Sequence, residues 1–176
     1  MADDAPWSDT IRFAEVARSP VHRRLQADEA ARRRIARSLG LDSLGRLEAE
    51  LTLTPWLDGV DVAGRWSADT TQLCSLSGEE FDAPLEGVFQ VRVLPPSSPN
   101  VPVETGEVTI DVEGEDPPDV AGSEVIDLAA YVVEHLALEI DPFPRKPGAV
   151  FEPPQEPHPP SPFDVLRDFK PARGGG

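Results

Sequence analysis

The sequence predicts an α+β protein: a small antiparallel β-sheet or partial barrel, two helices that pack on it, and a proline-rich C-terminal tail. Two segments show the periodicity of amphipathic helices, and the segment between them alternates between apolar and polar residues, as strands do. More than half of the 20 prolines lie in the last third of the 176 residues. We therefore expect a single domain over residues 1–144, and a linker with a short docking segment over residues 145–176.

The first helix is expected over residues 27–41. Alanine and arginine, both strong helix formers, dominate residues 30–37. Asp28 lies near the start, where a negative charge suits the positive end of the helix dipole. Gly40 provides a C-terminal stop, because glycine adopts the left-handed conformation that ends many helices.

The second helix is expected over residues 127–140, with Asp127 as its N-cap. Its apolar side chains recur every four residues and form one face: Leu128, Val132, Leu136 and Ile140. The polar side chains expected to point away from that face are Glu134, His135 and Glu139. Two prolines, Pro142 and Pro144, end the helix because proline cannot continue it.

Period-two alternation between the two helices predicts the sheet. The expected strands cover residues 47–54, 60–66, 69–74 and 85–94. Pro55 is expected to interrupt the first of them, Asp58-Gly59 to form a turn, and residues 76–81 to be turn-like.

Two further segments are less regular. Residues 7–16 are expected to form an extended arm that Ser19-Pro20 breaks. Residues 95–122 are expected to form a loop that contains one strand-like piece, residues 107–112.

Charge is unevenly distributed along the chain, which has a net charge of −16. Residues 47–144 hold two arginines and twenty-one acidic residues, whereas residues 12–37 hold eight arginines and three acidic residues. The acidic residues either solvate strand faces and loops or attract a basic partner such as a ribosomal protein.

The sequence offers no recognisable catalytic or metal-binding pattern. Cys74 is the sole cysteine, and the three histidines lie far apart at His22, His135 and His158. No nucleophile motif or phosphate-binding loop is present, so we expect no enzyme activity, no metal and no cofactor. The acidic N-terminus and the absence of a long apolar run lead us to expect a cytoplasmic protein.

Six arginines are the candidate RNA-binding residues: Arg23, Arg24, Arg32, Arg33, Arg34 and Arg37. Their planar guanidinium groups donate paired hydrogen bonds to phosphate and stay charged at all physiological pH values. Two interpretations remain open. The arginines contact nucleic acid, or they form a solvated helix face that pairs with the acidic sheet of the same molecule.

The tail contains a short apolar segment within residues 161–170. Its candidate docking residues are Phe163, Val165, Leu166 and Phe169. Ser161-Pro162 is a typical helix start, with serine as the cap and proline at the first position. The segment either packs back on the domain or docks as a helix in the groove of a partner.

The order of these pieces, over roughly residues 7–170, resembles the YceD family, the large ribosomal RNA subunit accumulation proteins. The tail is similar to the form found in alpha-class proteobacteria. The resemblance is carried by L-G-L at 39–41, C-S-L-S-G-E-E-F at 74–81, G-V-F-Q-V-R-V at 87–93, I-D-L, E-H-L-A-L and P-F-P-R within 126–145, and S-P-F-D-V-L-R-D-F-K at 161–170. One departure is that many relatives have a second cysteine and an arginine in a C-x-R-C turn, where this chain has Ser77 and Leu76. A metal or redox role proposed for relatives is therefore not expected here.

The resemblance implies a non-enzymatic role in the synthesis, processing or stability of 23S ribosomal RNA. The alternative is an acidic adaptor that binds a basic ribosomal protein without touching RNA. The partners expected are thus large-subunit ribosomal RNA, a basic ribosomal protein, or both, and no membrane.

Overall fold

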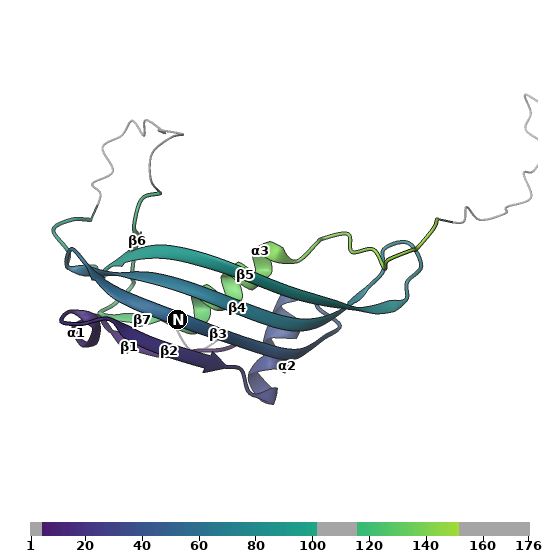
Figure 1. The fold of residues 1–176 in the computed structure, drawn as a ribbon, viewed down its shortest axis with the longest axis horizontal. Helices are drawn as coiled ribbons and strands as arrows, with labels where there is room; N and C mark the ends of the chain where they lie inside the picture. Colours follow the sequence, from purple (N-terminus) through teal and green to yellow (C-terminus); the bar gives the residue numbers. More distant parts are fainter. Residues whose placement is uncertain (1–4, 102–115, 152–176) are drawn as a thin grey trace, which may run out of the picture.

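A computed structural model of the chain describes residues 5–101 and 116–151. It confirms the α+β class: a five-stranded sheet in the order β2-β3-β4-β5-β6, a two-stranded sheet β1-β7, and helices that pack on them (Figure 1). All pairings are antiparallel except β5 with β6. The elements are β1 (Thr10–Arg12), α1 (Phe13–Val16), β2 (Val21–Gln26), α2 (Glu29–Leu39), β3 (Ser43–Trp56), β4 (Gly59–Leu73), β5 (Glu80–Leu94), β6 (Asp119–Val120), β7 (Val125–Asp127) and α3 (Leu128–Glu139).

Helix α2 confirms the first predicted helix, with slightly narrower bounds. The Asp28 carboxylate accepts a hydrogen bond from the backbone N–H of Ala31 at 2.7 Å, which satisfies a donor that the first turn leaves free. Gly40 ends the helix at φ +68°, a conformation that favours glycine. The helix buries Ala31, Ile35 and Ala36 against the sheet.

Helix α3 confirms the second predicted helix. Asp127 Oδ1 accepts hydrogen bonds from the backbone N–H groups of Ala129 at 3.1 Å and Ala130 at 3.4 Å. The same oxygen accepts from the N–H of Asp9 at 3.1 Å, so this residue also ties the N-terminal segment to the start of the helix. Because Asp127 ends β7 as well, a single side chain fixes where sheet β1-β7 meets α3.

Both long helices cover the same face of the five-stranded sheet (Figure 1). On β3 this face carries Leu47, Ala49, Leu51 and Leu53, which are all buried, as the alternation predicts. On the other face of the sheet, charged and polar side chains from four strands remain at least partly open to solvent. There Arg46 donates to both carboxylate oxygens of Asp69, at 2.9 and 3.0 Å.

The strands are longer than predicted. Pro55 does not interrupt β3, because β2 reaches only as far as Leu53 and the missing N–H of the proline interrupts no pairing with it. The segments expected as separate strands over 60–66 and 69–74 are one strand, β4, and β5 begins at Glu80 within the segment expected to be a turn. The tight turn is confined to the residues between β4 and β5, where the N–H of Gly78 donates to the carbonyl of Cys74.

Two reciprocal pairs of a glycine and an aromatic residue join β4 to β5. Gly64 lies opposite Phe89, and Trp66 lies opposite Gly87. A β-carbon at Gly64 would come within 2.4 Å of the Phe89 ring, and one at Gly87 within 2.8 Å of the Trp66 ring. Each aromatic side chain therefore occupies the space above a glycine on the neighbouring strand, which lets both lie flat within the core.

One expectation for the N-terminal part was wrong, and one strand there was missed. Residues 7–16 are not an extended arm throughout, since three residues of strand lead directly into the one-turn helix α1. Strand β2 was not expected at all. Its sequence V-H-R-R-L-Q buries only one apolar side chain, Leu25, because β2 is an edge strand.

Some predictions fall outside the described residues. These are the strand-like piece at 107–112 and the docking segment with Phe163, Val165, Leu166 and Phe169. Within the described residues, none of the helices has the length and apolar character needed to cross a membrane.

Candidate functional site

The six candidate arginines lie on two different elements. Arg23 and Arg24 belong to β2, and the other four belong to α2. Arg24 lies opposite Glu50 in β3 and forms an ion pair with Glu48 at 3.4 Å, on the sheet face that the helices leave open. It therefore faces away from α2 and pairs with a carboxylate of the sheet, although it belongs to a strand and not to the predicted helix face.

Two arginines of α2 hold the local structure together. The half-buried Arg32 donates to the carbonyl of Ala27 at 2.8 Å, just before the helix. Arg34 donates to the carbonyl of Pro6 at 2.9 Å and so ties the N-terminal segment to the helix. These contacts direct both guanidinium groups towards backbone oxygens of the protein itself.

Arg33 and Arg37 form an exposed stripe along α2. They are four residues apart, as are Glu29 and Arg33, so all three share one side of the helix. Arg33 makes an ion pair with Glu29 and its side chain is 73% exposed, so water weakens that pair. Arg37 is exposed and has no ion-pair partner within residues 5–101 and 116–151.

A groove of about 530 Å³ runs beside this stripe, between α2 and the chain that leads into β3. Its charged lining residues are Glu29, Arg32, Arg33, Arg37 and Asp42. Three guanidinium groups and two carboxylates thus line a concave surface, so the groove has a net positive charge in a protein whose overall net charge is −16. This arrangement, which we call the arginine stripe and groove, suits an anion such as a phosphate group.

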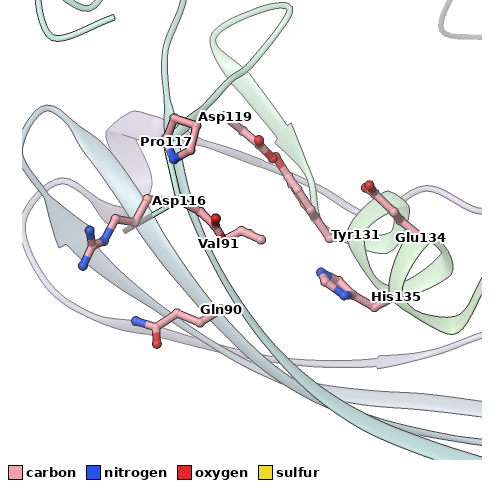
Figure 2. A pocket seen from close by; sticks show the side chains of 9 residues that line it. Gln90, Val91, Asp116, Pro117, Asp119, Tyr131, Glu134 and His135 are labelled. Atoms are coloured by element: carbon pink, nitrogen blue, oxygen red, sulfur yellow. The ribbon is translucent and has the colours of Figure 1, made fainter. Parts of the chain in front are cut away.

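An acidic pocket of about 490 Å³ lies between α3 and the C-terminal part of β5 (Figure 2). Three segments line it: Gln90, Val91 and Arg92 of β5, then Asp116, Pro117 and Asp119 at β6, then Tyr131, Glu134 and His135 of α3. Three carboxylates therefore surround it. The one cation in its lining, Arg92, lies 5.1 Å above the Trp56 ring and 3.8 Å from Asp61.

Tyr131 and Asp119, which both line this pocket, form a hydrogen bond with each other. The Tyr131 hydroxyl donates to the Asp119 carboxylate at 3.1 Å. Burial, together with the charge of Asp119, raises the pKa of Tyr131 above its usual value. The phenol therefore stays protonated and acts as a donor, which keeps the carboxylate in place.

His135 does not point away from the apolar face, contrary to the sequence-based expectation. Its ring stacks on Phe89 with the centroids 4.4 Å apart and the planes 9° from parallel. In the view of Figure 2 the ring lies below Tyr131 and Glu134, and all three residues line the pocket. The stacking explains the error, because an imidazole covers an aromatic ring of β5 as an apolar side chain would.

Cys74 is a buried thiol that lies in the turn between β4 and β5. The backbone N–H of Lys146 donates to its sulfur at 3.3 Å, and the Lys146 ammonium forms an ion pair with Glu79 at 3.0 Å. Hydrogen bonding by Ser77 and by the Lys146 N–H lowers the pKa of Cys74 to about 7. The turn is thus joined to the chain that follows α3.

The described residues contain no group of three or more histidine, cysteine or carboxylate side chains arranged for a metal ion. Comparison with family models, with curated proteins and with solved structures finds no match to this chain.

The acidic pocket was not foreseen from the sequence. Asp116 and Asp119 lie in a segment expected to be a loop, and Glu134 lies on a helix expected to project it into solvent. The parallel pairing of β6 with the end of β5 brings these residues together. Pairing between distant segments leaves no local periodic signal, so spacing along the chain could not have located this pocket.

Proposed function

We propose that the protein is a non-enzymatic factor for the synthesis, processing or stability of large-subunit (23S) ribosomal RNA, and that it contacts RNA through α2. The arginine stripe and groove is the observation that supports RNA contact. Arg33 and Arg37 lie side by side and open to solvent, in a chain that otherwise carries a large excess of carboxylates. The choice of ribosomal RNA rests on the resemblance to the YceD family.

Contacts in the structure support a smaller set of RNA-binding arginines than the six that the sequence offers. Arg33 and Arg37 would make the principal phosphate contacts, with Arg32 at the wall of the groove. Arg34 is directed to Pro6, and Arg24 is paired with Glu48 on the open face of the sheet. We therefore expect Arg24 and Arg34 to contribute less to RNA affinity than the sequence alone suggested.

Crosslinking in cells tests the proposal directly. The tagged protein is irradiated with ultraviolet light, and the attached RNA is sequenced. Reads concentrated at discrete positions of the large-subunit ribosomal RNA support the function. Reads spread in proportion to RNA abundance, in an experiment where a known RNA-binding protein gives discrete positions, contradict it.

A charge-matched pair of variants tests the site. Arg33→Glu with Arg37→Glu should lower the affinity for an RNA fragment recovered by crosslinking at least tenfold. Losing two phosphate contacts should also reduce the slope of log affinity against log salt by about 1.4. The control, Arg65→Glu with Arg145→Glu, makes the same change in net charge on β4 and after α3, where both arginines are exposed. Equal losses in the two double variants would mean that net charge, and not the stripe, governs binding.

The alternative function, an acidic adaptor for a basic protein, is favoured by the acidic pocket. That pocket is lined by α3 and β5, whereas the arginine stripe lies on α2, so the two functions do not exclude each other. Purification under the conditions of the crosslinking experiment separates them. If ribosomal proteins co-purify with the tagged protein and the attached RNA gives no discrete reads, the result favours the adaptor function.

A further inference from the structure

Among the residues that the structure describes, strand β5 has an open outer edge over most of its length. Strand β6 pairs with it only at Val93 and Leu94. From Glu80 to Arg92, no strand within the described residues pairs with the side of β5 that faces away from β4. An open edge offers backbone donors and acceptors to any extended chain that lies alongside it.

The alternation of backbone hydrogen bonds along β5 shows which of its residues direct their backbone groups towards this edge. The carbonyl of Leu94 accepts a hydrogen bond from Ala121 at 2.9 Å, so the backbone groups of Leu94 point outwards. Because backbone groups of successive residues in a strand point to opposite sides, every second residue before Leu94 also faces the edge. These residues are Asp82, Pro84, Glu86, Val88, Gln90 and Arg92. Pro84 is consistent with this assignment, because proline has no N–H and a residue that faces the outer edge donates no hydrogen bond to β4.

The two halves of the edge differ in how they are protected. The first half carries Asp82, Pro84 and Glu86, and both charge and proline discourage the pairing of a further strand. The second half, which begins at Gly87, has no such residue before Arg92. Val88 in this half is 76% exposed. The second half of the edge is therefore the part suited to accept another strand.

The surroundings of this half define the chemistry of a strand that would fit. On the side of α3, Leu85 and Val91 are half-buried apolar side chains that an apolar residue could cover. On the opposite side, Glu86 projects from the open face of the sheet. At the end of the edge lies the acidic pocket, with Asp116, Asp119 and Glu134.

We propose that the β5 edge from Gly87 to Arg92 binds an extended segment of a basic protein as an additional strand. Its backbone would pair with Val88 and Gln90, and its apolar side chains would lie over Leu85 and Val91. A lysine or arginine side chain of the segment would enter the acidic pocket and replace water around the three carboxylates. This surface is separate from α2, so the proposal does not depend on RNA contact.

A second copy of this chain is the less suitable occupant. Each copy has a net charge of −16, and like charges of this size oppose association. Antiparallel pairing of two β5 edges would also bring Asp82 or Glu86 of each copy close to the other acidic edge. Charge complementarity thus favours a basic partner over self-association.

Hydrogen exchange tests the edge in the intact protein. In the free protein, the amides of Val88 and Gln90 should exchange fast, whereas those of Phe89 and Val91, which face β4, should be protected. Adding a nine-residue peptide of alternating lysine and valine should slow exchange at Val88 and Gln90 at least tenfold. If these two amides are already protected in the free protein, the edge is occupied by this chain or by a second copy, and the proposal is wrong.

Affinity for the peptide separates strand addition from simple charge attraction. The alternating peptide should bind at least tenfold more tightly than a peptide of nine lysines, although the latter carries more charge. Glu134→Gln with Asp116→Asn should weaken binding of the alternating peptide at least fivefold. Stronger binding of the nine-lysine peptide, or no effect of the pocket variant, would overturn the proposal.

Substitutions at Val88 provide a matched series. Val88→Pro removes a backbone N–H that faces the outer edge, as the N–H of residue 84 would if that residue were not proline. It should therefore abolish peptide binding, while the circular dichroism spectrum stays unchanged. Because Val88 is exposed, Val88→Lys and Val88→Glu should both fold, and the lysine should weaken peptide binding at least fivefold relative to the glutamate. Equal affinities for these two variants, or peptide binding accompanied by a doubling of the protein's mass in sedimentation, would contradict the assignment.

Discussion

The two long helices cover the same face of one sheet, yet they present opposite charge. Helix α2 packs on β3 and carries four arginines with a single glutamate, whereas α3 packs on β5 and contributes Glu134 to the acidic pocket. Both helices bury their apolar residues in one core. The difference teaches that a shared core can hold a basic and an acidic surface at a fixed separation, so each surface can be tested while the other serves as its control.

The largest expected effect comes from breaking the core on which both surfaces depend. Gly64→Ala places a methyl group within 2.4 Å of the Phe89 ring and 2.7 Å of Leu51. Overpacking of this kind should lower the free energy of unfolding by about 3 kcal/mol, measured by urea denaturation. Gly45→Ala is the control, because its nearest neighbour would lie at 3.6 Å. Equal stability of the two variants would mean that the core yields to the added methyl group.

A smaller loss of stability is expected when the N-cap of α3, on the acidic side, is removed, and it should be confined to that side. Asp127→Ala removes the N-cap of α3 and the acceptor for Asp9, and should cost about 2 kcal/mol. Hydrogen exchange should accelerate in the first turn of α3 and in β1, and much less in α2. Asp127→Asn should restore most of the protection, since an asparagine oxygen can also accept these bonds. Uniform acceleration across both helices would contradict this localisation.

Removing the N-cap of α2, on the basic side, should lower the free energy of unfolding by less. Asp28→Ala removes a cap that accepts a single hydrogen bond, from Ala31, and should cost about 1 kcal/mol in urea denaturation. It should weaken RNA binding only as far as it frays the start of α2, because Arg37 lies at the other end of that helix. A stability loss larger than that of Asp127→Ala would reverse the comparison between the two caps.

A different kind of effect, one that depends on pH, is expected at Cys74, which belongs to neither surface. Its pKa in the fold is about 7, below the usual value of 9.0, so folding favours the thiolate. Stability should therefore rise as pH increases from about 7 to about 9, and be lost as pH falls through 7. Thermal unfolding at pH 7 and pH 9 measures this rise, and Cys74→Ser should abolish it. A rise that persists in the serine variant would assign it to another group.

The helices could be predicted from the sequence because their signals are local. Asp28, Gly40 and Asp127 mark helix ends through contacts within a few residues, and each acts as expected. Strand ends were harder to predict. Proline usually interrupts a strand, but Pro55 is tolerated because β2 pairs with β3 only as far as Leu53, which the sequence does not specify.

The candidate sites show the same limit, because contacts between distant segments cannot be predicted from local sequence patterns. The arginine stripe could be read from the spacing of Arg33 and Arg37, because both lie on one helix. The pairing of Arg24 with Glu48 and the contact of Arg34 with Pro6 could not, since each joins segments more than twenty residues apart. The acidic pocket is likewise assembled from β5, β6 and α3.

The pairing of Trp66 with Gly87 gives the protein a built-in optical signal. The Trp66 side chain is buried, and its indole N–H has no hydrogen-bond partner among the described residues. An indole in such surroundings should emit at shorter wavelength than Trp7 or Trp56, which are partly open to solvent. Because its ring lies over Gly87, at the start of the open β5 edge, its emission should change when a strand is added there. Fluorescence of the unlabelled protein can therefore follow that binding in real time.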